Sequence, residues 1–225
     1  MKRYNAFYLI HKALRAMLYD AAITLQQTDF SNSSEAENML SKINDVLFAF
    51  EQHAHHEDKF ILPAIEQFET GLAASFENEH VEDLRLSNSL KNLVIIYENT
   101  SFAEEQTACG SAIKKSFVEF LVFNIEHMAK EEMLLNQALW QHYTDEQILD
   151  IQQKLQASIS PAEMQSAAKW MMRAISNADA IDWLKKVKHT APQFIYENLI
   201  NIAQQELNET RFAMLQDALE EPALI

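Results

Sequence analysis

Hydrophobic residues recur every three or four positions along most of the first 141 residues, which is the period of an amphipathic α-helix. Short polar segments divide this part of the chain into four stretches. They predict helices at roughly residues 5–28, 34–68, 71–99 and 101–141. With only two glycines and four prolines, the chain has too few turn residues for a fold of hairpins and sheets. The pattern therefore predicts an all-α, up-down-up-down antiparallel four-helix bundle with additional C-terminal helices.

Helix starts are indicated by serine or threonine residues with glutamate or glutamine three positions later, the capping-box pattern. The five pairs are Ser34 with Glu37, Ser101 with Glu104, Thr144 with Gln147, Ser160 with Glu163, and Thr190 with Gln193. Beyond residue 142 the pattern is typical of shorter helices, with Trp170 and Trp183 on apolar faces. We expect a bundle domain over residues 1–142 and a C-terminal helical extension over residues 143–225. The extension is expected to pack on the bundle; a homodimer interface or a groove for a protein partner is the alternative.

Six polar side chains lie in or beside the apolar faces of the four predicted helices, where charged and polar residues are uncommon. They are His11 on the first helix, His53 and Glu57 on the second, His80 on the third, and His127 and Glu131 on the fourth. On the second and fourth helices, the apolar faces continue beyond the glutamates to Phe60 and Leu134. On the third helix, Leu84 and Ser87 follow along the same side as the histidine.

The spacing of these residues brings them to one level of the bundle. Residues level with each other on antiparallel neighbours lie equally far from the loop that joins the two helices. For His11 and His53 the midpoint is Asn32, which lies in a polar segment between predicted helices. For Glu57 with His80, and for His80 with His127, the midpoints likewise lie within about three residues of predicted turns. Turns and candidate ligands were identified from different residues, so their agreement supports one shared site.

The residue types at this level are those of a metal site. His53 and Glu57 are four residues apart, as are His127 and Glu131, and this spacing places each pair on one helix face. Imidazole nitrogens and carboxylate oxygens suit iron, manganese or zinc. No lysine or arginine of the same faces neutralises the two glutamates, and burying an unpaired charge is costly.

Six converging donors without a thiolate favour a dinuclear site, with Glu57 and Glu131 as bridges, over a single zinc ion that prefers four ligands. A bundle without metal is the remaining alternative. In that case the histidines and glutamates would hydrogen-bond to one another in a hydrated core.

Other polar residues near this level are expected to have lesser roles. His55 is expected to be solvated, because it points away from the site, and His56 to lie at the edge of the site. Glu132 is an alternative ligand, while Asp58 is expected to be solvated or to contact a ligand. The single cysteine, Cys109, excludes an internal disulfide and a Cys-x-x-Cys site, and is expected to be partly buried.

The charge of the chain restricts its partners. The 225 residues carry a formal net charge of -15, from 33 acidic and 18 basic residues. Such a field repels phosphate backbones and anionic lipid surfaces, which argues against nucleic acid and membrane partners. No segment has the roughly 18 uncharged residues of a membrane span, and His11 ends the N-terminal apolar run too early for a signal peptide. We therefore expect a soluble, cytoplasmic protein.

The ordered set of candidate ligands resembles the hemerythrin-like (HHE) family over roughly residues 5–141. The resemblance rests on His11, the segment from His53 to Asp58 with Glu57 inside it, His80, and the segment from His127 to Glu132 with Glu131 inside it. It implies a four-helix bundle that holds two non-haem iron ions with an oxo or hydroxo bridge. Manganese or zinc are possible substitutes for iron.

The pattern departs from the oxygen-carrying hemerythrins, which have a second histidine at the position of Leu84 and whose helix-four carboxylate is an aspartate five residues after its histidine. It is instead similar to di-iron proteins implicated in iron-sulfur cluster repair and to the hemerythrin-like domain of an iron-sensing ubiquitin-ligase subunit. The resemblance implies a module that binds or senses oxygen, nitric oxide, peroxide or iron status. A di-iron enzyme acting on nitric oxide or peroxide, or involved in iron-sulfur cluster repair, is the alternative, and the lack of an electron-donor motif in the sequence favours the module.

Overall fold

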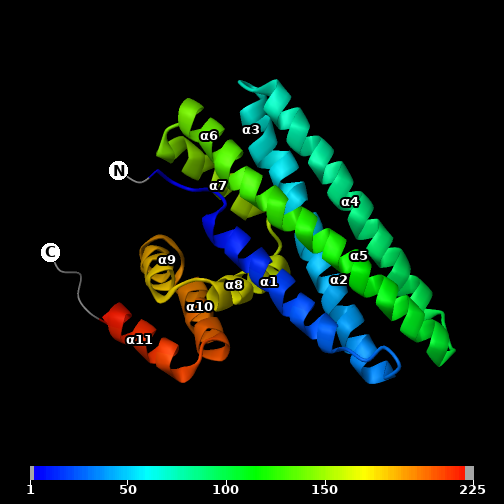
Figure 1. Ribbon diagram of the computed structural model, residues 1–225. Coiled ribbons are helices and arrows are strands. Elements are labelled where there is room, and N and C mark those ends of the chain that lie inside the picture. Colours follow the sequence, from blue (N-terminus) through cyan, green and yellow to red (C-terminus); the bar gives the residue numbers. More distant parts are fainter. Residues whose placement is uncertain (1–2, 221–225) are drawn as a thin grey trace. The chain divides into compact units, whose positions relative to one another are not determined.

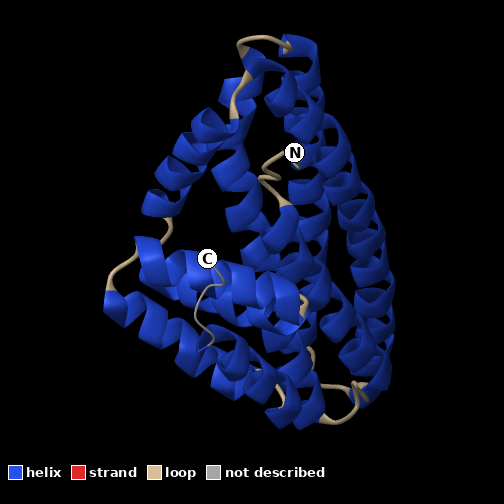
Figure 2. Cartoon of the chain, turned by 90° about the vertical axis from the view of Figure 1, so that its left-hand side faces the viewer, coloured by secondary structure: helices blue, strands red, loops and turns tan. Residues whose placement is uncertain are grey.

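The computed structural model describes residues 3–220, and this range contains helices and no β-strand (Figures 1 and 2). The elements in chain order are α1 (Tyr8–Gln27), α2 (Ser33–His56), the π-helical turn η1 (Glu57–Ile61), α3 (Leu62–Glu66), α4 (Thr70–Glu98), α5 (Ala103–Lys130), the π-helical turn η2 (Glu131–Leu135), α6 (Asn136–His142), α7 (Asp145–Ser158), α8 (Pro161–Ala174), α9 (Asn177–Thr190), α10 (Gln193–Glu206) and α11 (Glu209–Glu220). The predicted all-α bundle with additional C-terminal helices is confirmed. Within residues 3–220, no helix has the length and apolar character needed to cross a membrane.

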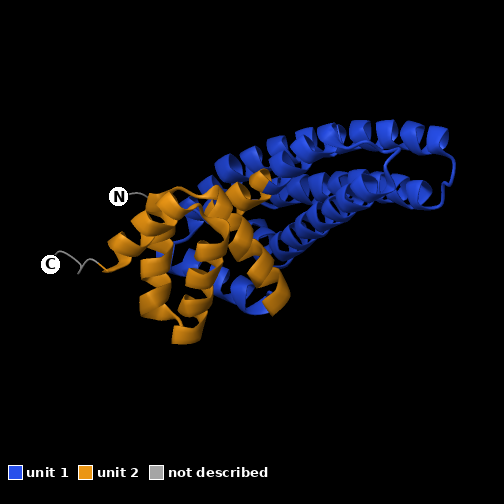
Figure 3. Cartoon of the chain, turned by 90° about the horizontal axis from the view of Figure 1, so that it is seen from below, with its two compact units in different colours: residues 1–8, 17–159 blue, residues 9–16, 160–225 orange. Residues whose placement is uncertain are grey.

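The chain divides into two compact units (Figure 3). Unit 1 comprises residues 1–8 and 17–159, and unit 2 comprises residues 9–16 and 160–225. The predicted domain boundary between residues 142 and 143 stays a prediction.

The long helical segments of unit 1 run along one another, with α4 beside α5 (Figure 1). The three connections between the four long segments fall at residues 28–32, 67–69 and 99–102. These are the turns that the sequence predicts. The second and fourth predicted helices are each interrupted by a π-helical turn, so that η1 separates α2 from α3 and η2 separates α5 from α6.

Two of the five predicted capping boxes are confirmed. Thr144 caps α7 with Gln147, and Ser160 caps α8 with Glu163, each by reciprocal side-chain and backbone hydrogen bonds. A further box, in which Ser176 pairs with Asp179 at the start of α9, was not predicted, because the residue three positions after the serine is aspartate instead of glutamate or glutamine.

The other three predicted boxes are wrong. Asn32, not Ser34, caps α2, because its side chain reaches the backbone N–H groups one turn into the helix. At α5 the N-cap residue is Phe102, which makes no side-chain cap hydrogen bond. Thr190 ends α9, where its hydroxyl donates to the carbonyl oxygen of Lys186, 2.9 Å away.

Aromatic side chains fill the core of unit 1 on the side of the α4–α5 connection. The rings of Phe50 on α2 and Phe120 on α5 pack edge to face, with their centroids 5.4 Å apart. Nearer to the loops, Gly110 on α5 lies directly against the ring of Phe30, and the hydroxyl of Tyr97 donates to the Phe30 carbonyl oxygen at 2.8 Å. The close approach at Gly110 requires a residue without a side chain.

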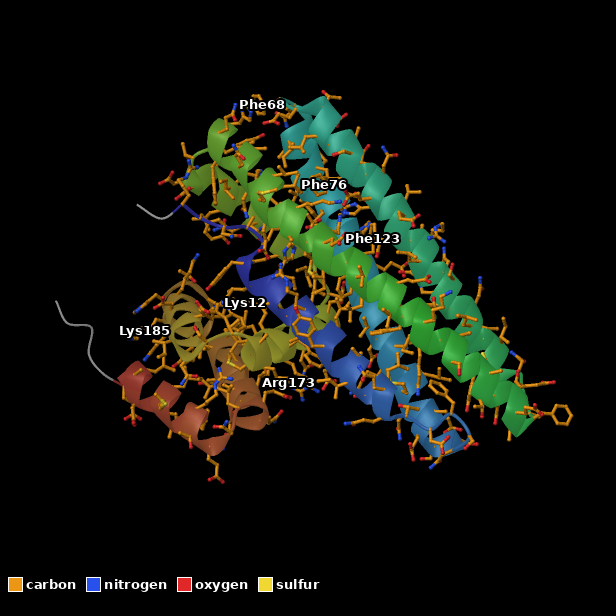
Figure 4. The ribbon with its side chains drawn as sticks, in the orientation of Figure 1. Lys12, Phe68, Phe76, Phe123, Arg173 and Lys185 are labelled. Atoms are coloured by element: carbon orange, nitrogen blue, oxygen red, sulfur yellow. The ribbon has the colours of Figure 1, made fainter. Side chains whose placement is uncertain are left out.

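Unit 2 has a hydrophobic core of its own. Its buried residues come from α8, α9, α10 and α11 and from the residues directly after α8 and α10, and they are Ala168, Met172, Ile175, Ala180, Leu184, Leu199, Ile202, Ala203, Leu207 and Leu215. Leu9, from the stretch of α1 that belongs to this unit, packs against them. On the same stretch, Lys12 forms an ion pair with Asp179 at 2.7 Å (Figure 4). Trp170 and Trp183 are partly buried, as expected for helices with one apolar face.

Candidate metal centre

Two π-helical turns begin at the two glutamates that the sequence singles out. In η1 the backbone N–H of Leu62 donates to the carbonyl oxygen of Glu57, and in η2 that of Asn136 donates to Glu131. Each His-x-x-x-Glu pair therefore ends an α-helix and its glutamate opens a wider turn. π-Turns inside α-helices are frequent at functional sites, because they displace one residue from the regular helical register.

This displacement corrects one detail of the predicted apolar faces. Ile61 and Leu135 are the fully buried residues after the glutamates, whereas Phe60 and Leu134 are only partly buried. A regular α-helix would have placed Phe60 and Leu134 on the buried face, but each wide turn rotates the chain by about one residue.

Four predicted ligands from three helical segments of unit 1 converge on one buried point. Glu57, His80, His127 and Glu131 each offer one donor atom, and these atoms all lie within 4.8 Å of one another. All four residues are buried, and Glu131 is fully so. His53 joins the two glutamates in an overlapping set with the same spacing. The structure thus brings together five of the six predicted ligands within unit 1.

The imidazoles face the carboxylates through their Nε2 atoms. Nε2 of His127 lies 2.9 Å from Oε1 of Glu131, and Nε2 of His80 lies 3.4 Å from Oε2 of Glu57 and 3.8 Å from Oε1 of Glu131. Nε2 of His53 lies 3.3 Å from Oε1 of Glu57. Both histidine-glutamate pairs therefore point their donor atoms into the same space.

Carboxylates outside the cluster hold two of the histidines by their other ring nitrogen. Nδ1 of His80 lies 2.6 Å from Oδ1 of Asp58, and Nδ1 of His127 lies 2.8 Å from Oε2 of Glu79. Glu79 also accepts a hydrogen bond from Nζ of Lys130 at 2.8 Å. When Nδ1 donates to a carboxylate, Nε2 is left as the ligand atom, which is the usual arrangement of a metal-binding histidine. The sequence could not reveal Glu79, because its partner lies on another helix.

Burial and like charge dominate the electrostatics of the cluster. Loss of solvent and the neighbouring charge of Glu131 hold the pKa of Glu57 well above its usual range. Burial alone lowers the pKa of His80, but the hydrogen bond with Asp58 and the nearby carboxylates of Glu131 and Glu57 outweigh it and raise the pKa to about 12. Burial is likewise outweighed at His127, where Glu131 and then Glu79 raise the pKa to about 9. Protons thus neutralise the cluster where no cation does so.

The donor set fits a metal ion on the chemistry of its own atoms. Both carboxylate oxygens of Glu57 and Nε2 of His80 are buried and have no hydrogen-bond partner among residues 3–220. Buried polar atoms without a hydrogen-bond partner are rare unless they contact an ion or a water molecule. Nitrogen and oxygen donors at this spacing suit iron, manganese or zinc.

His11, the sixth predicted ligand, lies on α1 within residues 9–16, the stretch that belongs to unit 2. Its side chain is fully buried, and it shares one face of α1 with the buried Leu14 and Leu18. His55 is exposed, as predicted, and His56 is partly exposed. Cys109 is partly buried, as expected, and its thiol donates to the carbonyl oxygen of Leu93 at 3.4 Å.

Asp58 and Glu132, the two acidic residues next to the glutamates of the cluster, differ in their contacts. Asp58 is about half exposed and contacts a ligand, as one of the two expected alternatives states. Glu132 is partly buried and stands outside both ligand groups found among the described residues.

The buried face of α4 differs from the predicted one. Leu84 is 49% exposed, whereas Asp83 is only 5% exposed and takes the place expected for Leu84. The steps from Phe76 to His80, Asp83 and Ser87 are four, three and four residues, the alternation that keeps a helical stripe straight. The sequence did not predict a buried charged residue three positions after His80, because a buried helix face is expected to continue with apolar residues.

Aromatic rings pack against one histidine of the cluster, His127. The ring of Phe123 on α5 stacks on His127, with centroids 5.8 Å apart and an interplanar angle of 12°, and the centroid of Phe76 on α4 lies 5.7 Å away from the same histidine (Figure 4). Apolar walls of this kind lower the local dielectric, which strengthens the binding of a cation by carboxylates.

The chain is similar in sequence to F-box/LRR-repeat protein 5 of several animals. Over 195 residues the chain is 22% identical to F-box/LRR-repeat protein 5 of Salmo salar, which covers 85% of this chain and 26% of that protein. For F-box/LRR-repeat protein 5 of Bos taurus and of Mus musculus, the identities are 27% and 26% over 133 residues, which cover 58% of this chain and 18% of each relative. The chain therefore spans about a quarter, or less, of the length of these curated relatives. No solved structure matches the chain significantly.

The family model described as the hemerythrin HHE cation-binding domain matches residues 3–139, which is more than half of the chain. The match extends from the segment before α1 into α6 and includes every histidine and glutamate of the clusters described above. The chain therefore belongs to the hemerythrin HHE cation-binding domain family.

Proposed function

We propose that the protein binds two iron ions and acts as a module that binds or senses a small ligand such as oxygen, nitric oxide or peroxide, or that responds to iron status. The observation that carries this proposal is the convergence of Glu57, His80, His127 and Glu131 in a buried space. Two adjacent buried carboxylates require compensation, and two cations would supply it without protons.

In this proposal all six predicted residues are ligands. His53, His80, His127 and His11 supply nitrogen donors, and Glu57 and Glu131 bridge the two ions. The support for Glu57 and Glu131 as bridges is that each lies near more than one histidine: Glu57 faces His53 and His80, and Glu131 faces His80 and His127. The support for His11 is its complete burial on the face that the sequence predicts for a ligand.

The residues around the cluster would keep this donor set in order. Asp58 and Glu79 hold the rings of His80 and His127 in one orientation and fix the tautomer that exposes Nε2. Phe76 and Phe123 both pack near the ring of His127 and would exclude water from it. Iron, when bound, would supply open coordination positions at which a small molecule binds.

The replacement Glu57→Ala tests the bridging role. We expect it to abolish the binding of two irons per chain, because it removes both oxygens that face His53 and His80, while most of the helix content remains. The measurement is elemental analysis after anaerobic loading with ferrous iron, with circular dichroism as the check on folding. His55→Ala is the matched control, since His55 is exposed one turn or less from Glu57 and should keep full loading. Unchanged iron content in Glu57→Ala would show that Glu57 is not a ligand.

A second measurement separates a binding module from an enzyme. Iron-loaded protein is mixed with an excess of nitric oxide or of hydrogen peroxide, together with a reductant, and consumption is followed over time. A module that binds its ligand takes up at most about one ligand per metal centre and then stops. Sustained consumption over many equivalents would replace the proposed sensing role with an enzymatic one.

A further inference from the structure

Asp83 and Asn124 form a buried polar pair next to the metal centre that has no role in the proposed ligand set. Nδ2 of Asn124 donates to Oδ1 of Asp83 at 2.6 Å and to the carbonyl oxygen of Phe120 at 3.1 Å. Asp83 is 5% exposed and Asn124 is 1% exposed. Burial of a carboxyl group in a helical bundle is costly, so a function for this group is expected.

The pair occupies the layer of the bundle directly below the ligands. Asp83 follows His80 by three residues on α4, and Asn124 precedes His127 by three residues on the antiparallel α5. Three residues of helix correspond to about 4.5 Å along the axis, and both steps lead toward the α4–α5 connection. The charges of His80, His127 and Glu131 all affect the pKa of Asp83.

Aromatic rings lie close to this layer. Phe50 and Phe120 pack edge to face there, three residues before His53 on α2 and four before Asn124 on α5. Besides Glu57 and Glu131, Asp83 is the one buried carboxyl group in the described part of unit 1. Asn124 engages Oδ1 and leaves Oδ2 for a second partner.

Asp83 is also suited to donate a hydrogen bond. Burial raises the pKa of Asp83, and Glu131 adds to this, although Asn124 and the two histidines act in the opposite direction. A carboxyl group that keeps its proton can donate to an anion, whereas an ionised one would repel it.

We propose that Asp83, held in place by Asn124, contacts a small anion bound at the metal centre and donates a hydrogen bond to it. This inference rests on the metal centre of the proposed function. It assigns the specificity for anionic over neutral ligands to a residue that is not a metal ligand.

The test is azide binding by iron-loaded protein, followed by its optical charge-transfer bands, with the iron content of every sample measured in parallel. In Asp83→Asn, the amide still accepts from Asn124 and still donates, so azide affinity should stay within about threefold of the unmodified protein. In Asp83→Leu, the donor is lost while the volume is kept, and azide should bind about tenfold or more weakly at the same iron content.

Ser87→Ala is the matched control, because Ser87 is buried on the same face of α4 one turn farther from the ligands. It should leave azide affinity unchanged. If Asp83→Leu does not fold, Asp83→Ala removes the carboxyl group without added bulk and should show the same loss.

Two outcomes overturn the inference alone. One is azide affinity in Asp83→Leu or Asp83→Ala equal to that of the unmodified protein at two irons per chain. The other is a loss of iron in these variants, which would make Asp83 a determinant of metal binding instead of a contact to the anion. Failure of the unmodified protein to take up iron would overturn the proposed function, and the inference with it.

Discussion

The rings of His80 and His127 are held from outside the cluster by carboxylates of different exposure. Asp58, which contacts His80, has a half-exposed side chain, whereas Glu79, which contacts His127, is mostly buried and is also held by Lys130. Although burial acts to raise it, Lys130 and His127 lower the pKa of Glu79, so this carboxylate stays charged. The orientation of both candidate ligands therefore depends on residues outside the cluster.

Replacement of Asp58 by asparagine should weaken metal binding without removing any ligand. The amide accepts a weaker hydrogen bond from Nδ1 of His80, which makes Nε2 a poorer donor, and such changes reduce metal affinity by about 10- to 100-fold. Competition with a chromophoric chelator measures the affinity. Glu77→Gln is the control: it removes an exposed carboxylate on α4, three residues before His80, and is expected to leave metal affinity unchanged. Equal affinity in both variants would contradict a role of Asp58 in orienting His80.

The sequence predicts the residues that converge, but of the residues that support them it indicated only Asp58, as one of two alternatives. His53, Glu57, His127 and Glu131 were recognisable, because polar side chains four residues apart on an apolar face are unusual. Asp83 was missed at a position where Leu84 was expected, and its burial became clear only from the true course of the α4 stripe. Contacts such as that between Glu79 and His127 depend on the rotation of two helices about their axes, which periodicity alone does not fix.

The π-helical turns η1 and η2 explain why the long helices could be predicted but their buried faces could not be followed to the end. The hydrophobic pattern of α2 and α3 reads as one helix, as does that of α5 and α6. After each glutamate, the buried position moves by one residue, from Phe60 to Ile61 and from Leu134 to Leu135. A wide turn has no side-chain signature of its own, so it escapes a reading based on a period of 3.6 residues.

The contact between α5 and the α1–α2 connection depends on Gly110. A Cβ atom added at this position would overlap the ring of Phe30, which is buried. We expect Gly110→Ala to destabilise the protein by about 1–2 kcal/mol, because overpacking outweighs the gain in helix propensity. Urea unfolding measures this change.

The other glycine supplies the matched control for this experiment. A Cβ atom at Gly71, near the start of α4, would meet no atom within 4 Å. Gly71→Ala is therefore expected to be neutral or to stabilise by up to about 1 kcal/mol. If the two substitutions changed the free energy of unfolding equally, Phe30 would not pack closely against α5 at Gly110.

Charge balance at the metal centre affects the stability of the whole protein. The chain has a net charge of -15, and its core contains two carboxylates side by side. Without a cation, protons on Glu57, His80 and His127 keep this arrangement tolerable, and their pKa values are raised accordingly. Metal ions that replace these protons also bind only the folded chain, so that metal binding and folding are coupled.

The metal-free protein should lose stability as the pH rises from 6 to 9. The pKa values of His127, about 9, and His80, about 12, exceed the usual histidine value of 6.5, so the folded protein binds protons that the unfolded chain has released. The stabilisation they contribute is complete below pH 6.5 and is lost as the pH rises through the folded-state values; the raised pKa of Glu57 acts in the same direction. Metal-loaded protein lacks these protons, so its melting temperature should change much less. Thermal unfolding of chelator-treated and metal-loaded samples at both pH values measures the difference in melting temperature between the two forms. This difference should be larger at pH 9 by several degrees, since about 1 kcal/mol shifts the melting temperature of a chain of this size by about 2–4 °C. A metal-free protein that is as stable at pH 9 as at pH 6 would show that the cluster does not hold these protons.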